Sequence, residues 1–128
     1  MYKRQNHKCL DKKKILIVDD NKINQIVTQK VLEQYGMQHQ TANNGQEALD
    51  IVQLNSFDAI LMDINMPIMN GIESSKAIRS LNIETPIIAL TATEFNNNEN
   101  LENYGINSSI IKPYKTEELV SKLLSYTS

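Results

Sequence analysis

Polar side chains follow each of four short apolar runs in this chain, and their types suit metal and phosphate chemistry. Asp19 and Asp20 come after the first run, Asp63 after the second, Thr91 after the third and Lys112 after the fourth. Three neighbouring carboxylates repel one another unless a cation lies between them. A hydroxyl and an ammonium group, in contrast, bind phosphate oxygens. If folding brings these residues together, they form a place where a cation and a phosphoryl group meet.

The apolar runs have the composition of buried strands. Three of them occupy residues 15–18, 59–62 and 86–90, the fourth is the strand expected at 108–111, which ends in two isoleucines, and a weaker, edge-like strand is expected at 38–42. Continuous apolar runs of this length are typical of strands buried on both faces. Between the runs, apolar residues recur at helical spacing over 23–35, 48–52, 72–81 and 117–126. This alternation predicts an α/β fold of five strand–helix units, with helices on both faces of a parallel sheet.

The predicted sheet places the polar residues at one edge. In an open parallel sheet the carboxyl ends of the strands lie together, and ligands bind there. Either Asp19 or Asp20, taken alone, would also be explained as a helix N-cap. Capping accounts for neither the third acid, Asp63, nor a lysine at the end of a strand. We therefore expect a functional site at this edge.

The residue types at this edge favour particular chemistry. Oxygen ligands without His or Cys select a hard cation, Mg²⁺ or Mn²⁺, over Zn²⁺. Thr91 and Lys112 would bind the oxygens of a phosphoryl group. A carboxylate can also attack phosphorus and form an acyl phosphate. We assign that role to Asp63, which stands alone, whereas Asp19 and Asp20 suit a metal-binding pair.

Length and charge narrow the classes of function. The chain has 128 residues, 41% of them hydrophobic and 22% charged, as expected for one globular domain. Six of its 13 basic residues fall within the first fourteen positions, whereas residues 15–128 hold 7 basic and 14 acidic residues, a net of −7. An acidic body repels the phosphate backbone of nucleic acids, so we expect no nucleic-acid binding.

The basic segment 1–13 is interpreted as a leader or linker, and residues 14–128 as the domain. The segment lacks the apolar stretch of a signal peptide, and no run approaches the ~20 apolar residues of a membrane span. The single cysteine, Cys9, allows no internal disulfide and fits a reducing compartment. We expect a cytoplasmic location without direct membrane contact.

Four motifs occur in order along most of the chain, namely ILIVDDN at 15–21, ILMDINMPIMNG at 60–71, ALTA at 89–92 and KP at 112–113. Together they resemble the receiver domain of two-component response regulators, over residues 14–128. Segments 20–24 and 66–71 look most like receivers carried on hybrid histidine kinases, which implies either a separate cytoplasmic regulator or the cytoplasmic part of a membrane-bound kinase. The resemblance implies a flavodoxin-like fold with strand order 2-1-3-4-5.

The resemblance also implies a place in a phosphorelay. Asp63 would take a phosphoryl group from a phosphohistidine of a histidine kinase or of a histidine phosphotransfer domain. The carboxylates of Asp19, Asp20 and Asp63, with the main-chain carbonyl of Asn65, would surround Mg²⁺. Such a domain modifies only itself and switches its partner-binding face. We therefore do not expect the isolated domain to be an enzyme that acts on a separate substrate.

The phosphoryl oxygens have their own expected partners. By the same resemblance, Thr91, the backbone amide of Ala92 and the Lys112 ammonium would bind them, and the Lys112–Pro113 peptide would be cis. One family feature is missing, because Ser109 stands three positions before the lysine, where an aromatic residue is typical.

Residues 95–104 also depart from the family pattern. They hold five asparagines, which compete with helical hydrogen bonds through their own side chains. The fourth helix is therefore expected to be short or frayed. From this and from the missing aromatic residue we infer that phosphorylation orders residues 93–104 instead of turning one ring.

Other functions fit the residues less well. A receiver-like interaction module that is never phosphorylated would share the fold, but it would not need the acids and the lysine. A Mg²⁺-dependent phosphatase with an aspartyl nucleophile would place a second acid where this chain has Asn65. Nucleotide binding would require a Gly-rich loop, and the four glycines are isolated. A flavodoxin would place hydroxyls, not carboxylates, after its first strand.

Overall fold

The computed structural model describes residues 11–66, 68–92 and 101–127. Its five strands are β1 (Lys14–Val18), β2 (Gln38–Ala42), β3 (Ala59–Asp63), β4 (Ile87–Thr91) and β5 (Ser108–Ile111). The helices are α2 (Lys22–Gln34), α3 (Gly45–Leu54), α4 (Gly71–Ser80) and α5 (Thr116–Thr127), with a 3₁₀ turn, η1, at Leu101–Tyr104. All strand pairs are parallel, and the sheet order is β2-β1-β3-β4-β5. The predicted fold class and strand order are confirmed.

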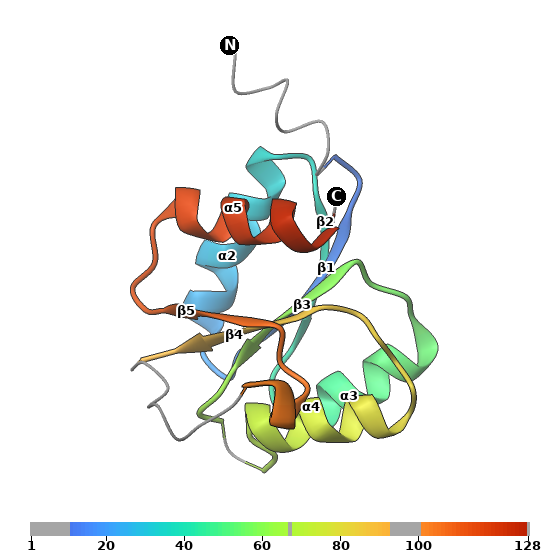
Figure 1. Ribbon diagram of the computed structural model, residues 1–128. Helices are drawn as coiled ribbons and strands as arrows, with labels where there is room; N and C mark the ends of the chain where they lie inside the picture. The colour runs from blue at the N-terminus through green and yellow to red at the C-terminus, as the bar shows by residue number, and fades with distance from the viewer. Residues whose placement is uncertain (1–10, 67, 93–100, 128) are drawn as a thin grey trace.

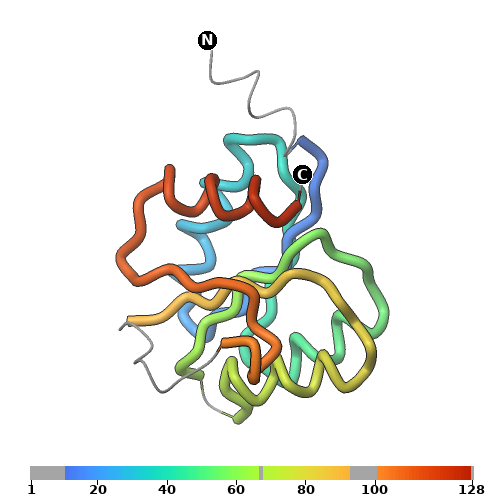
Figure 2. Tube along the Cα trace, viewed as in Figure 1, coloured from blue at the N-terminus to red at the C-terminus, as the bar shows by residue number. Residues whose placement is uncertain are grey.

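Helices cover both faces of the sheet. Figures 1 and 2 show α2 and α5 on one side, and α3 and α4 on the other. Successive residues of β1 serve the two layers in turn, since Ile15 and Ile17 pack toward α2 and α5, whereas Leu16 and Val18 pack toward α3 and α4. All four are buried. This two-sided burial explains why the run is apolar without interruption.

The connection between β4 and β5 differs from the others. Its described part holds the turn η1 and no α-helix, so the described residues contain four α-helices where five strand–helix units were expected. The expectation of a short or frayed fourth helix concerns residues 95–104, and only residues 101–104 of that segment are described. Residues 93–100 lie outside the described part of the chain, and most of the segment expected to become ordered falls there.

Residues 1–10, most of the expected leader, also lie outside the described part. Residue Lys12, just before β1, donates its backbone N–H to the carbonyl of Gly36 at 2.8 Å. None of the helices within residues 11–66, 68–92 and 101–127 combines the length and the apolar character needed to cross a bilayer.

The N-terminal half of α2 turns polar residues inward and apolar residues outward. Gln25 and Thr28 are each only 3% exposed, whereas Ile23, Ile26 and Val27 are 71%, 49% and 52% exposed. The apolar spacing predicted the helix correctly, but most of those side chains do not contact the sheet. The buried polar side chains have hydrogen-bond partners, which removes the penalty of burying them. The outer face of α2 is therefore an apolar surface, called the α2 patch below and made of Ile23, Ile26 and Val27.

One residue of the loop between β3 and α4 has a strained backbone. Ile68 has a φ of 71°, a left-handed conformation that is unfavourable for a β-branched residue. Its side chain is 82% exposed, so little packing offsets this strain.

Replacing Ile68 tests this strain. Ile68→Asn is expected to increase the free energy of unfolding by about 1 kcal/mol, measured by urea denaturation, because Asn tolerates the left-handed region. Ile68→Val, also β-branched, is the control and should gain nothing; equal stability of the Asn and Val variants would contradict the strain.

Candidate functional site at the carboxyl edge of the sheet

The residues predicted to do chemistry lie together at the carboxyl edge. Asp19 follows β1, Asp63 ends β3, Thr91 ends β4 and Lys112 follows β5. Asp19, Asp20 and Asp63 each offer a carboxylate oxygen, and these three oxygens lie within 4.8 Å of one another. Because parallel strands end on the same side, segments separated by more than forty residues converge at one point.

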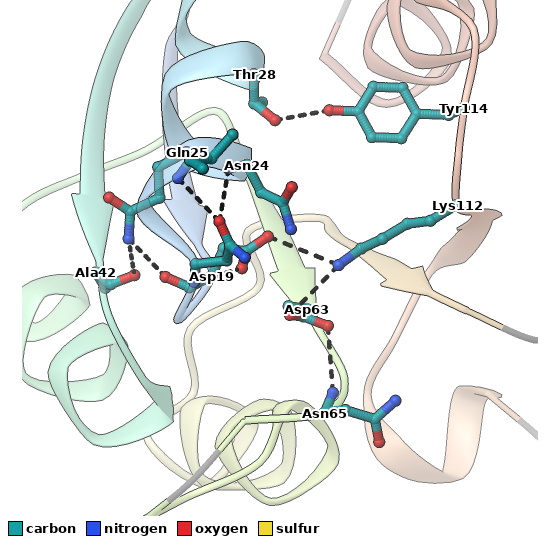
Figure 3. A network of polar contacts seen from close by, with 11 residues as sticks. Asp19, Asn24, Gln25, Thr28, Ala42, Asp63, Asn65, Lys112 and Tyr114 are labelled. Atoms are coloured by element: carbon teal, nitrogen blue, oxygen red, sulfur yellow. Dashed lines mark hydrogen bonds and ion pairs between the residues drawn. The ribbon is translucent and has the colours of Figure 1, made fainter.

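Lys112 reaches into this acidic cluster. Its Nζ lies 3.4 Å from Oδ2 of Asp63 and 3.7 Å from Oδ2 of Asp19 (Figure 3). Both carboxylates are buried, whereas the lysine side chain is 26% exposed. The ammonium group thus sits between two carboxylates and balances one of the three negative charges. A net charge near −2 remains when all groups are ionised.

The surroundings of Asp63 shift the pKa of its carboxyl. Burial raises the pKa of its carboxyl above the ordinary value of 3.8, and the nearby carboxylate of Asp19 raises it further. The Lys112 ammonium lowers the pKa in opposition, as does the hydrogen bond from the Asn65 backbone N–H to Asp63 Oδ1, at 3.2 Å. The net effect is a raised pKa. Additional positive charge at this point would therefore favour the ionised carboxylate.

Asp19 is held by hydrogen bonds on both its side chain and its backbone. The N–H of Asn21 donates to Asp19 Oδ1 at 2.9 Å. The buried amide of Gln25 donates to the carbonyl of Asp19 at 2.5 Å (Figure 3) and to Oδ1 of Asn43 at 2.9 Å. Gln25 therefore ties the end of β1 to the loop after β2. Sequence reasoning missed this residue; the signal was a glutamine at the helical spacing of the buried residues Thr28 and Leu32.

The remaining predicted residues lie around this centre. Thr91 is buried and lies one position beyond Leu90, which pairs in register with Asp63. Its carbonyl accepts a hydrogen bond from the backbone N–H of Lys112 at 2.7 Å. Ala92 follows directly and is exposed. The Lys112–Pro113 peptide is cis, as the resemblance implied.

Three predicted residues, Asp20, Asn65 and Ser109, lie outside the buried centre of the site. Asp20 is exposed, and the side chain of Asn65 points away from Asp63 in Figure 3. Ser109, at the position where the family has an aromatic residue, pairs with Ala89 in the middle of β5. It therefore lies away from the strand ends that form the site.

Gly71 allows α4 to begin close to the site. A Cβ atom at this position would collide with the backbone carbonyl of Asp63. The N–H of Gly71 donates to the carbonyl of Ile64 at 3.0 Å, which fixes this close approach. Glycine is required here because the start of α4 touches the end of β3 directly.

A cavity of about 400 Å³ opens beside the acidic cluster. Asp19 and Lys112 line one part of it, and Val27, Thr28 and Tyr114 line another. It lies between α2 and the loop that follows β5. The site is therefore accessible from the side on which the α2 patch is exposed.

The donor set fits a hard divalent cation. Three carboxylate oxygens lie close enough to share one ion, and the residual charge of the cluster matches an ion of charge +2. Oxygen ligands of this kind are those that Mg²⁺ prefers. The adjacent ammonium and hydroxyl groups suit an anion bound next to such a cation.

Comparison with known proteins identifies one family of domains. The family model for the response regulator receiver domain matches residues 15–124. The autoinducer 1 sensor kinase/phosphatase LuxN of Vibrio campbellii is 43% identical over 77 residues, which is 60% of this chain and 9% of LuxN. The chain thus spans less than a tenth of that relative.

Two solved structures resemble the fold closely. The receiver domain of the sensor histidine kinase PA1611 of Pseudomonas aeruginosa, with a magnesium ion coordinated in its active site cleft, has a TM-score of 0.83 at 33% identity, covering 91% of this chain and 98% of that one. A chain from the complex of the Saccharomyces cerevisiae phosphotransfer protein Ypd1 with the Ssk1 receiver domain has a TM-score of 0.85 at 29% identity, covering 92% and 90%.

The raised pKa of Asp63 has a consequence for stability. A carboxyl that binds its proton more tightly in the folded than in the unfolded chain destabilises the fold when ionised. Without divalent cations, Asp63→Asn is expected to raise the thermal midpoint at neutral pH by a few degrees, at about 4 °C per kcal/mol. This difference should shrink as the pH falls through the raised pKa, because the wild-type carboxyl then becomes neutral too.

Asp50→Asn is the matched control for this experiment. Asp50 is exposed on α3, so its replacement should change stability by less than about 0.5 kcal/mol. Magnesium should reduce the difference between the wild type and Asp63→Asn by stabilising the wild type. If Asp63→Asn is less stable than the wild type at neutral pH, the prediction is wrong, and the attraction between Lys112 and the ionised Asp63 stabilises the fold by more than the burial of that charge destabilises it.

Proposed function

Because the chain belongs to the response regulator receiver domain family, we propose that Asp63 accepts a phosphoryl group from a partner phosphohistidine. The observation that carries this proposal is the position of the Asp63 carboxylate. It lies 3.4 Å from the Lys112 ammonium and shares a cation-sized cluster with Asp19 and Asp20. Asp63 also ends β3, the central strand of the sheet. A nucleophile at the end of β3 therefore lies next to the Lys112 ammonium and to the proposed metal-binding carboxylates.

The other residues of the edge take complementary roles. The carboxylates of Asp19, Asp20 and Asp63 would hold Mg²⁺, together with the main-chain carbonyl of Asn65. When bound, this ion supplies positive charge that stabilises the ionised nucleophile and the phosphoryl oxygens. A magnesium-bound receiver domain among the similar structures supports this assignment.

The phosphoryl oxygens would contact Lys112, Thr91 and the backbone amide of Ala92. In the transfer, an Asp63 oxygen forms a bond to phosphorus as the bond from phosphorus to the partner's imidazole nitrogen breaks. The electron pair stays with the imidazole, which then takes a proton from water. Lys112 and Thr91 place a positive charge and a hydroxyl donor where negative charge accumulates.

The α2 patch is the surface we assign to the phosphohistidine partner. Ile23, Ile26 and Val27 are exposed beside the cavity that leads to Asp19 and Lys112. Exposed apolar residues grouped in this way mark protein contact sites. The likeness to a receiver domain in complex with Ypd1 supports a histidine phosphotransfer domain or a histidine kinase as the partner.

The proposal includes where the domain lies in the chain and in the cell. We assign residues 14–128 to the receiver domain and residues 1–13 to a basic leader or linker. The domain would catalyse its own phosphorylation and dephosphorylation without turning over a separate substrate. We place it in the cytoplasm, as a regulator or as part of a hybrid histidine kinase.

Direct phosphorylation tests the proposed role of Asp63. With Mg²⁺ and acetyl phosphate, the intact mass of the wild type should increase by one phosphoryl group, and Asp63→Asn should abolish this adduct. Chelation of Mg²⁺ should also abolish it, whereas Asp50→Asn should leave it unchanged. An adduct that persists in Asp63→Asn would place the acceptor elsewhere. If magnesium binds but no adduct forms, the domain is an interaction module that is never phosphorylated.

The partner surface is tested by comparing two phosphoryl donors. Ile23→Ser combined with Ile26→Ser should slow transfer from phosphorylated histidine phosphotransfer proteins, Ypd1 among them, by about tenfold or more, since apolar contacts at the centre of an interface dominate its affinity. Acetyl phosphate needs no docking surface, so its rate should not change. Leu54→Ser removes an apolar side chain that is 86% exposed at the far end of α3 and serves as the control. Equal effects on both donors would contradict a docking role.

A further inference from the structure

A hydrogen bond between two hydroxyl groups connects α2 to the loop after β5. The hydroxyls of Thr28 and Tyr114 lie 2.6 Å apart and join residues 86 positions distant in the chain. Thr28 is 3% exposed, and Tyr114 is half-buried against the core on the α2 and α5 side. Figure 3 shows the two side chains pointing toward each other beside Lys112.

The loop that carries Lys112 is short and is held at both ends. At its start, the Lys112 N–H donates to the Thr91 carbonyl at 2.7 Å. At its end, the carbonyl of Lys115 accepts hydrogen bonds from the first turn of α5, and the Lys115 N–H donates to Oε1 of Glu118 at 3.1 Å. The Tyr114 hydroxyl adds a third attachment between these two ends, and this one reaches across to α2.

The lysine ammonium depends on the position of this loop. Its distances of 3.4 Å to Asp63 and 3.7 Å to Asp19 are set by a long, flexible side chain whose backbone is part of the loop. Lys112, Thr28 and Tyr114 all line the same cavity of about 400 Å³, so no packed core lies between the hydroxyl pair and the lysine. The bond across this cavity adds a restraint on the loop to the packing of Tyr114 against the core.

We propose that Thr28 and Tyr114 form a positioning pair that holds the Lys112 ammonium over the Asp19 and Asp63 carboxylates. The inference rests on the proposed function, because the lysine matters for rate only if a phosphoryl group binds next to it. Neither hydroxyl touches the reacting atoms, so the pair acts through Lys112. Since Thr28 is on the helix that carries the α2 patch, the same bond links the docking surface to the lysine.

The first test measures the rate of adduct formation from acetyl phosphate with saturating Mg²⁺. Tyr114→Phe and Thr28→Val should each lower the maximal rate by about tenfold, as expected when a group that stabilises charge is misplaced. The double variant should be no slower than either single variant, because one bond is lost in all three. Thr28→Ser keeps the hydroxyl and should keep the wild-type rate. Saturating Mg²⁺ keeps the metal site filled in every variant, so a change in magnesium affinity does not alter the maximal rate.

A second comparison separates positioning from a general loss of stability. In a Lys112→Gln background, Tyr114→Phe should cause no further loss of rate, because the group it positions is gone. Tyr35→Phe removes another tyrosine hydroxyl from the same side of the core and should leave the rate unchanged. A further loss in the Lys112→Gln background, or wild-type rates in both hydroxyl-lacking variants, would overturn the inference.

The inference can also be tested without phosphorylation. The side-chain ammonium resonance of Lys112 should be protected from exchange in the wild type, and Tyr114→Phe and Thr28→Val should remove that protection. If the wild type takes no phosphoryl group, the proposed function fails, and this measurement still decides the positioning role. Unchanged protection of Lys112 in both variants would overturn it.

Discussion

Like charges cannot share one edge of a sheet unless positive charge lies among them, and this constraint organises the molecule. Asp19, Asp20 and Asp63 bring oxygens within 4.8 Å of one another, and two of these carboxylates are buried. Lys112 balances one charge, and the remaining charge calls for a divalent ion. Burial still dominates at Asp63, whose carboxyl has a raised pKa. Positive charge added at the site would therefore lower the pKa of Asp63 and favour its ionised form.

The surrounding structure keeps these groups in place against their repulsion. The strands supply the main positions, because β1, β3, β4 and β5 all end at the same edge. Finer control comes from polar side chains and from one close backbone approach. Gln25 fixes the carbonyl of Asp19, and Gly71 lets α4 begin against the carbonyl of Asp63. Each device acts within a few residues of a charged group.

Helix α2 combines two tasks that place opposite demands on its surface. Its inner face holds hydrogen-bonding residues, Gln25 and Thr28, that serve the site. Its outer face exposes the α2 patch to solvent. A helix that merely covered the sheet would show the reverse arrangement. The inversion is confined to the N-terminal half of the helix, since Leu32 in the C-terminal half is buried in the core, and it is this half that carries the proposed docking surface and the proposed positioning residue.

Local patterns in the chain were enough to predict the strands, the α/β class and the meeting of Asp19, Asp20, Asp63, Thr91 and Lys112 at one edge of the sheet, whereas the strand order came from the family resemblance. These predictions rested on apolar runs that end in charged or hydroxyl residues and on motifs such as ILMDINMPIMNG. Such patterns succeed because a parallel sheet places every strand end at one edge, whatever the loops do. The folded chain alone revealed the inward glutamine, the outward isoleucines of α2 and the bond between Thr28 and Tyr114. These features depend on which side of a helix meets the sheet and on contacts between residues far apart in the chain, and helical spacing does not encode either.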